Sequence, residues 1–363
     1  MRRPQVRDAV QVQVLFLFFG FAIAAFFPFL SLYYREHHGL GEAQIGVIIM
    51  VAGIARTVAN PLWGHFSDTR LGRVLVLQIG LLGAVIAALW LNLVDGLVLV
   101  AAATALHSVF FVSLGPNIDA IALVHLGDGR LTDYGRIRGW ESVTYAGGCL
   151  GFGLLLQAFG MSWAMPLFAV SSVAVLAWTI TIPRDEGRAL DHASKLGAVG
   201  AVFREAPRFW GFLAAVFLVW TGFNAAWNFI ALKIDDAGGG PLLIGVGAAF
   251  GGLLELPTMR ISSKLHGRWG LRKVYAAGCA IYAVGFALWG AVDDATLLSF
   301  LTFLEGVGFS LLFTTGVAVV GRLLPTGLYS TGSSVMGMVG ASASGPSWVR
   351  SWVGGSINTS VRV

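Results

Sequence analysis

Residues 44–73 read QIGVIIMVAGIARTVANPLWGHFSDTRLGR, an apolar run of membrane-spanning length that carries Arg56 and leads into a short charged loop. Residues 243–273 repeat this arrangement as LIGVGAAFGGLLELPTMRISSKLHGRWGLRK. Both copies have an Ile-Gly-Val near their start, and Glu255 takes the place of Arg56 in the second copy. Two halves that repeat a helix, a basic loop and the next helix predict a duplicated membrane transporter, with an ionisable residue at the matching place in each half.

The composition of the chain agrees with a membrane protein. Its 363 residues are 56% hydrophobic and 12% charged, with a mean hydropathy of +0.76. Soluble domains have about a quarter of their residues charged, so a soluble fold is excluded. A helix needs roughly 20 apolar residues to cross a bilayer, and the chain has room for about ten to twelve such helices.

The apolar runs predict an all-α polytopic protein with about eleven membrane spans. The first run, Val12 to Tyr34, is too long for a signal peptide and is interpreted as a permanent helix. The predicted spans are 12–34, 44–64, 74–93, 97–120, 140–160, 163–182, 209–231, 242–262, 274–292, 296–320 and about 328–343.

The basic residues predict the orientation. If the N-terminus is cytoplasmic, the outer loops hold only Arg35 and Lys233, and the other loop arginines and lysines fall on the inner side. An excess of Lys and Arg marks the cytoplasmic side of a membrane protein, so the net charge of +5 needs no nucleic-acid partner. We expect a multi-pass protein of the cell inner membrane with a cytoplasmic N-terminus.

A polar stretch at residues 183–208 divides the chain into an N-terminal six-helix half, 1–182, and a C-terminal half, 209–343. We interpret the stretch as a cytoplasmic linker without chemistry of its own. The tail 344–363 contains Ser, Gly and Arg where a twelfth span would need about 20 apolar residues. The sequence therefore predicts a missing twelfth helix and a truncated or frame-shifted C-terminus.

Glycines gather in the predicted spans at 140–160 and 242–262. Small residues allow the backbones of two helices to come close together. Two explanations stay open at this stage: static packing, or smooth faces that slide past each other during transport.

The charged loop GHFSDTRLGR resembles the signature of the major facilitator superfamily between its second and third helices. The chain departs from the signature at Thr69, where a basic residue usually follows the aspartate, and the second copy SSKLHGRWGLRK has no aspartate. The resemblance implies two pseudo-symmetric helical bundles that work by alternating access, with this loop as a cytoplasmic gate. The residues in matching roles are Gly64, Asp68, Arg70, Gly72 and Arg73.

Four further segments resemble the phenylpropionate-permease-like branch of that superfamily, which is related to sugar and nucleoside proton symporters. They are PFLSLYY with GLGEAQIG, GIAR, NIDAIA with DYGRIRGWESV, and LLELPTMRISSKL. The segment LEGVGFSLLF resembles a branch segment that more often has histidine in place of Glu305. The resemblance implies a secondary transporter of a small organic solute, coupled to protons.

Arg56 and Glu255 are predicted near the middle of the second and eighth spans. A charge at that depth costs at least about 2.5–3.5 kcal/mol, so such residues usually face a cavity or a partner. Arg56 stays charged and can clamp a carboxylate with two hydrogen bonds, whereas Glu255 can load and release a proton. Structural ion pairs are the alternative for both residues.

Asp119 and Glu305 are two further candidates for proton handling. Asp119 lies near the inner end of the fourth span, after Pro116, which can bend the helix. Its alternative is a simple interfacial charge. Glu305 lies deep in the tenth span, and Glu141, three residues after Arg138, is interpreted as half of a surface pair.

The seventh span places aromatic rings and amides at helical spacing. This face is either a binding wall for an aromatic or ring-shaped solute or ordinary aromatic packing. The residues proposed to bind are Asn224, Trp227 and Asn228.

No enzyme motif, metal-ligand cluster or phosphate-binding loop is recognised, and His107 and His125 are too far apart to act together. We therefore expect no enzyme activity, no cofactor and no metal. The preferred function is proton-coupled symport of an aromatic or other organic anion by a monomer in the lipid bilayer. The alternatives are an exporter of the drug-efflux kind and a non-transporting membrane receptor. Import and export are not distinguished.

Overall fold

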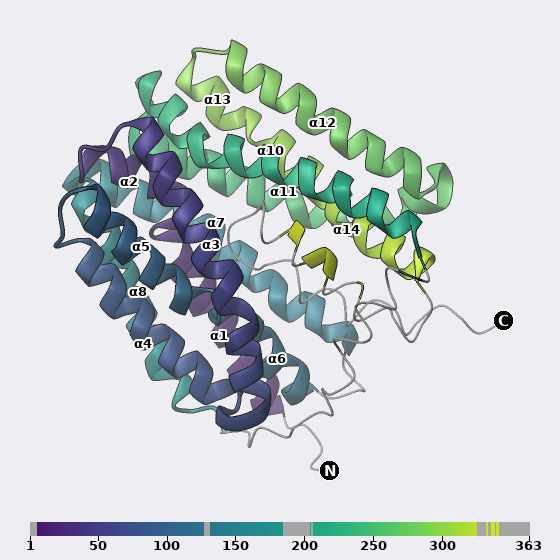
Figure 1. The fold of residues 1–363 in the computed structure, drawn as a ribbon, viewed down its shortest axis with the longest axis horizontal. Helices are drawn as coiled ribbons and strands as arrows, with labels where there is room; N and C mark the ends of the chain where they lie inside the picture. The colour runs from purple at the N-terminus through teal and green to yellow at the C-terminus, as the bar shows by residue number, and fades with distance from the viewer. Residues whose placement is uncertain are drawn as a thin grey trace. The chain divides into compact units, whose positions relative to one another are not determined.

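The computed structural model describes residues 6–126, 131–183, 204, 206–324, 332, 335–337 and 339–340, and within these ranges the side chains of 6–9, 68, 69, 126, 131–136 and 263 are not described. Throughout this part of the chain the regular structure is helical, with no strand (Figure 1). The α-helices are α1 (Val6–Ala24), α2 (Leu30–Glu36), α3 (Glu42–Phe66), α4 (Arg73–Leu91), α5 (Leu97–Phe111), α6 (Leu114–Leu126), α7 (Leu131–Phe159), α8 (Ala164–Thr179), α10 (Arg208–Asp236), α11 (Gly240–Trp269), α12 (Leu271–Ala291), α13 (Ala295–Leu301) and α14 (Phe303–Leu323).

Within the described residues, ten helical segments are long and apolar enough to cross a membrane. They match the first ten predicted spans in order, which confirms the all-α polytopic fold. The predicted eleventh span, about 328–343, and the tail 344–363 lie largely or wholly outside the described residues. The ten segments are Val10–Glu36, Glu42–Phe66, Arg73–Leu91, Leu97–His125, Ile137–Phe159, Met161–Thr179, Arg208–Asp236, Gly240–Ser262, Leu271–Ala291 and Ala295–Leu323.

The outward faces of the helices are apolar, as a lipid environment requires. On α4, Leu82, Ile86 and Leu89 lie three or four residues apart and are 53%, 57% and 42% exposed. That spacing places them on one face of the helix. A continuous exposed apolar stripe is unfavourable in water and is expected in contact with lipid tails.

The described residues form two compact units. Unit 1 holds those within Met1–Gly148 and Phe159–Asp191, and unit 2 holds those within Cys149–Ala158 and His192–Gly345. In unit 2, α11 and α12 both pack against α14 (Figure 1). The predicted half boundaries at 182 and 209 and the linker between them stay predictions, because residues 184–203 lie outside the described part.

Two predicted spans are broken by proline. A proline ring clashes with the carbonyl group four residues earlier in a helix. Pro28 stands four residues after Ala24, the last residue of α1, and a short 3₁₀ turn at Phe27–Phe29 precedes α2. Pro116 stands four residues after Val112, in the gap between α5 and α6. Near Pro116, where the sequence predicted a bend, α5 and α6 are separated by a break, and the break at Pro28 is an addition to the sequence prediction.

The repeated loop has the same backbone conformation in both copies. Gly72 precedes α4 with φ 74° and ψ 162°, and Gly270 precedes α12 with φ 76° and ψ 156°. A positive φ in this range favours glycine because a side chain would strain the backbone. The duplication seen in the sequence thus extends to the turn that starts the next helix in each half.

Candidate functional site

In unit 2, α11 and α14 contact each other through small residues on three successive turns. The Thr302 hydroxyl lies 2.8 Å from the carbonyl oxygen of Gly247, and the Ser310 hydroxyl donates to the carbonyl oxygen of Glu255 at 3.2 Å. Between these contacts, a Cβ on Gly306 would meet the carbonyl oxygen of Gly251. The two backbones are therefore too close for any side chain at Gly306.

This close contact brings two of the predicted proton carriers together. Glu305 is 5% exposed, and its Oε2 atom would lie 3.3 Å from a Cβ on Gly251, one helical turn before Glu255. The charges of Glu305 and Glu255 interact with each other. Glu305 also lies in the first turn of α14, where the helix N-terminus favours a negative charge.

Tyr282, on α12, is the third member of this cluster and was not recognised from the sequence. Its side chain is 5% exposed and interacts electrostatically with both Glu305 and Glu255. Its hydroxyl oxygen is buried and has no hydrogen-bond partner within the described residues. A lone tyrosine in an apolar span carries no signal that would separate it from ordinary packing.

The aromatic face predicted on α10 is connected to this cluster through stacked rings. The Phe223 ring stacks on Tyr282 with centroids 5.7 Å apart and on Trp227 with centroids 6.0 Å apart. The amide groups of Asn224 and Asn228 donate to carbonyl oxygens one turn earlier on their own helix, at 2.6 and 2.8 Å. Those donors are engaged locally, and the binding role of this face stays a prediction.

In unit 1, Arg56 lies on α3 without a carboxylate partner among the described residues. The side chain is half-buried, and its Nε atom is fully buried without a hydrogen-bond partner in the same set. Its charge interacts with Tyr34 and His107. The structural ion pair weighed as its alternative role is thus not seen within the described residues.

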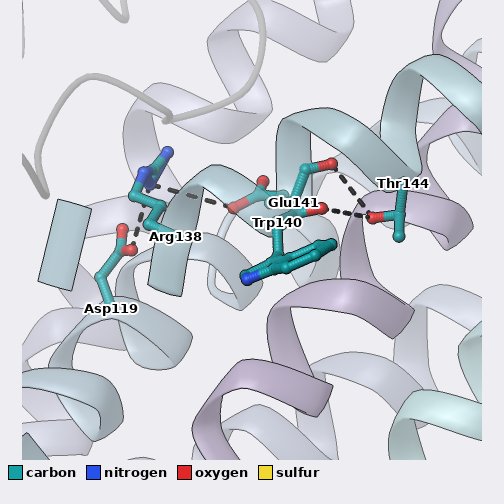
Figure 2. A network of polar contacts seen from close by, with 5 residues as sticks. All are labelled: Asp119, Arg138, Trp140, Glu141 and Thr144. Atoms are coloured by element: carbon teal, nitrogen blue, oxygen red, sulfur yellow. Dashed lines mark hydrogen bonds and ion pairs between the residues drawn. The ribbon is translucent and has the colours of Figure 1, made fainter. Parts of the chain in front are cut away.

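Asp119, the fourth predicted site residue, is held by an arginine of α7. The Nη1 atom of Arg138 lies 3.2 Å from Oδ1 of Asp119 and 3.9 Å from Oε2 of Glu141, and all three side chains are buried (Figure 2). A buried ion pair with two carboxylates on one guanidinium is more than a simple interfacial charge.

The interpretation of Glu141 as half of a surface pair is wrong. The residue is 4% exposed and lies well inside α7, which begins at Leu131. Its backbone also lies against α1, where a Cβ on Gly20 would meet the carbonyl oxygen of Glu141. The side chain therefore belongs to the buried cluster with Arg138 and Asp119.

The predicted gating loop follows α3 directly. Ser67–Leu71 form a π-helical turn, and the Ser67 hydroxyl donates to Oδ1 of Asn117 on α6 at 2.6 Å. Of the motif residues, Gly64 and Arg70 are exposed, Gly72 forms the positive-φ turn and Arg73 begins α4. The side chain of Asp68 lies outside the described residues, and the gating role stays a prediction.

A pocket of about 680 Å³ in unit 1 contains none of the candidate residues. It lies between α4 and α8, and no ionisable side chain among the described residues lines it, so it adds nothing to the charged clusters. Its lining residues are Leu75, Gln78, Ile79, Leu82, Leu176, Thr179, Ile180 and Ile182.

Comparison with known proteins identifies the family. The sequence model of the MFS_1 like family matches residues 11–360. The chain is 28% identical over 347 residues to the maltose permease of Geobacillus stearothermophilus, covering 94% of this chain and 85% of that protein. It is 24% identical over 369 residues to the uncharacterized transporter YwbF of Bacillus subtilis (strain 168), covering 98% and 88%.

Solved transporter structures have the same fold. The nucleoside transporter NupG superposes with a TM-score of 0.81 at 15% identity, covering 96% of this chain and 89% of that one. A POT family transporter in complex with a thioalcohol conjugated peptide superposes with a TM-score of 0.72 at 14% identity, covering 93% and 88%. The chain therefore belongs to the MFS_1 like family and is a membrane transporter of the major facilitator superfamily type.

Proposed function

We propose that the protein is a proton-coupled symporter that carries a small organic anion across the cell inner membrane by alternating access. It acts as a monomer with its N-terminus in the cytoplasm. The observation that carries the proposal is the pairing of Glu305 with Glu255 across the α11–α14 contact. The alternative of a non-transporting receptor loses its basis, because the family and the relatives are transporters.

The carboxylate pair supports proton coupling for an electrostatic reason. Two negative charges close together in a buried helix contact repel each other, and one bound proton removes one of them. The proton then travels with the pair when the carrier changes its open side. The Tyr282 hydroxyl, which has no partner within the described residues, is available to donate to the charged carboxylate.

Arg56 supports the choice of an anion as substrate. A guanidinium at membrane depth is costly unless a negative group compensates it, and within the described residues no carboxylate does so. A bound carboxylate would supply that charge with two parallel hydrogen bonds. The loaded carrier would then hold a neutralised Arg56 and a protonated glutamate pair, with little uncompensated buried charge.

A second candidate is uptake of a neutral sugar, and the 28% identity to a maltose permease favours it. It differs from the main proposal in the substrate alone and keeps the glutamate pair as the proton site. Under this candidate Arg56 would donate hydrogen bonds to hydroxyl groups of the solute rather than to a carboxylate.

The test is uptake into liposomes that contain the purified protein and carry an imposed pH gradient. Labelled benzoate, maltose and uridine are offered in turn, so that aromatic acid, sugar and nucleoside are compared directly. We expect uphill accumulation of the acid, which disappears when an uncoupler collapses the gradient. Accumulation that does not respond to the uncoupler would contradict proton coupling.

Variants then assign the roles. Glu255→Gln and Glu305→Gln each mimic a protonated carboxyl group, so each should lose uphill accumulation and keep exchange of internal for external substrate. Asp293→Asn is the matched control, because Asp293 pairs with Lys233 at the surface and is 86% exposed in its side chain. Normal pH-driven accumulation by Glu255→Gln would make Glu255 structural and leave Glu305 or Asp119 to carry the coupling.

A further inference from the structure

Arg56 and His107 of unit 1 each have a buried nitrogen atom without a hydrogen-bond partner among the described residues, although the two side chains interact electrostatically. One is Nε of Arg56 on α3, and the other is Nε2 of His107 on α5. The charge of Arg56 acts on His107 and on Tyr34. Buried polar groups in folded proteins are nearly always hydrogen-bonded, so two exceptions in one cluster require an explanation.

The His107 ring is held in place by three phenylalanine rings. Phe26 and Phe168 contact its edge or face at 5.3 and 5.2 Å between centroids, and Phe111 stacks on it at 5.4 Å. His107 is 5% exposed, and its Nε2 atom is buried among these rings without a hydrogen-bond partner within the described residues. A histidine fixed in this way presents a donor in a defined direction.

This cluster also lies at the two proline breaks. Phe26 lies between α1 and the turn that contains Pro28, and Phe111 is the last residue of α5 before the gap at Val112. Inside a membrane, interrupted helices are tolerated only where protein or a cavity surrounds the free backbone groups. In transporters such interruptions accompany the binding sites for substrate and coupling ion.

The remaining polar groups of the cluster are already paired with each other. The Tyr34 hydroxyl and Oγ1 of Thr104 are 2.9 Å apart and both residues are buried. Thr104 lies three residues before His107, on the same face of α5. The buried nitrogen atoms of this cluster without a partner among the described residues therefore belong to Arg56 and His107, and the acceptor that suits both at once is a carboxylate, which has two oxygens and about four lone-pair sites.

We infer that Arg56 and His107 together bind the carboxylate group of the transported solute. The guanidinium compensates the negative charge and donates to one carboxylate oxygen, and the imidazole N–H donates to the other. This deepens the proposed function, on which it rests for the solute: it assigns a carboxylate rather than a neutral sugar, and it adds a specificity residue on α5 that nothing in the sequence pattern had selected.

The smallest carboxylate tests the site without knowledge of the natural solute. Protein labelled with ¹⁵N-histidine in detergent is titrated with acetate, with chloride to match ionic strength and acetamide as the neutral compound of the same shape. His107→Phe assigns the ring signal and keeps the aromatic packing. We expect saturable shifts of the His107 nitrogens with acetate and none with acetamide. An unmoved His107 signal at saturating acetate overturns the inference.

Variants separate a shared site from a local effect. Arg56→Gln should weaken acetate binding at His107 at least tenfold, because the charge that anchors the anion is gone. An unchanged titration in Arg56→Gln overturns the shared site. His107→Gln keeps an N–H donor, so its affinity for acetate, measured by isothermal titration calorimetry, should stay within about threefold of the wild-type affinity. Loss of the ring signal in this variant also assigns His107 if His107→Phe does not fold.

A second histidine of unit 1 provides the control, and transport separates the two proposals. Nδ1 of His125 lies 2.8 Å from the carbonyl oxygen of Ile121 on its own helix, so its signal should not move with acetate. Acetate binding at His107 together with proton-independent uptake would keep the carboxylate site and refute the coupling. Proton-coupled uptake without acetate binding would refute the carboxylate site alone.

Discussion

His38 lies just beyond the first span, and both of its ring nitrogens are buried. Burial lowers its pKa from 6.5 to about 4; neighbouring His37 lowers the pKa further, and Asp95 and the backbone of Val94 act in the opposite direction. The unfolded chain therefore binds the proton more tightly than the folded protein does. The contribution of a neutral His38 to stability is complete above pH 6.5 and is lost as the pH falls toward 4.

We therefore expect the thermal unfolding temperature in detergent to fall between pH 6.5 and 4, and to fall less in His38→Phe than in the wild type. Phenylalanine keeps the edge contact with the Tyr33 ring, whose centroid is 5.1 Å away, and removes the titrating nitrogen. Differential scanning fluorimetry of both proteins across this pH range measures the difference. Parallel curves for the two proteins would exclude His38 as a source of the pH dependence.

We expect the loss of Arg138 to lower the stability of the protein more than the loss of one partner of a surface ion pair. Removal of one partner from a buried ion pair costs about 3–5 kcal/mol, because the other charge stays buried alone. Arg138→Gln should lower the unfolding temperature strongly, and the double variant with Asp119→Asn should recover part of the loss. Thermal unfolding of the single and double variants measures this, and a double variant no more stable than Arg138→Gln would argue against their coupling.

At the residue scale the sequence predicted which charged side chains lie in membrane spans, but not which of them interact with each other. Arg56, Asp119, Glu255 and Glu305 stood out because charge is costly in a membrane span. The pairing of Glu305 with Glu255 could not be predicted, since it depends on the relative rotation of α11 and α14. His107 was set aside because its partner was sought in a second histidine, whereas the interaction is with Arg56.

At the scale of whole helices, the prolines also show that a local sequence rule does not decide the structure by itself. Pro28 follows the last residue of α1 by four positions and Pro116 follows the last residue of α5 by five, whereas Pro61 and Pro257 lie inside the unbroken α3 and α11. The local rule is the same for all four prolines, because each removes a donor and crowds the preceding turn. Tertiary packing decides whether the helix stops, and the sequence of one span does not contain that information.

The α11–α14 contact provides a prediction about helix packing. Gly306→Ala introduces a Cβ that meets the carbonyl oxygen of Gly251, a backbone atom that cannot rotate away. Overpacking of this kind costs typically 1–3 kcal/mol, and it also separates Glu305 from Glu255. We expect a lower unfolding temperature together with a loss of proton-driven uptake.

The matched control for this substitution is Gly290→Ala on α12. A Cβ there has nothing within 4 Å, and alanine favours a helix over glycine by up to about 1 kcal/mol. Gly290→Ala should therefore be at least as stable as the wild type and transport normally. Equal destabilisation by the two substitutions would show that the Gly251–Gly306 contact has no special tightness.

Over the whole molecule the apolar runs predicted the membrane spans, and the internal repeat predicted that a helix, a basic loop and the next helix occur twice. The first ten spans match in order, and the positive-φ glycines Gly72 and Gly270 begin the corresponding helices α4 and α12. Hydropathy is a strong signal because a bilayer leaves few alternatives to a helix of sufficient length. The repeat does not indicate the substrate. The residues proposed to bind the solute and the proton, Arg56 and Glu255, stand where the two copies differ.

The last prediction concerns the side of the membrane on which the repeated loops lie. In the part of the chain that the structure describes, six candidate spans separate the loop at Gly72 from the loop at Gly270, an even number, so we expect both loops on one side. The distribution of Arg and Lys predicts that this is the cytoplasmic side.

Single cysteines at Thr69 and Gly267 should then be protected from a membrane-impermeant maleimide in intact cells, and a cysteine at Gly39 should be labelled. The two native cysteines, Cys149 and Cys279, are first replaced by alanine. Labelling of Thr69→Cys and Gly267→Cys in intact cells, with Gly39→Cys protected, would reverse the orientation, and opposite behaviour of the two loops would refute the parallel repeat itself.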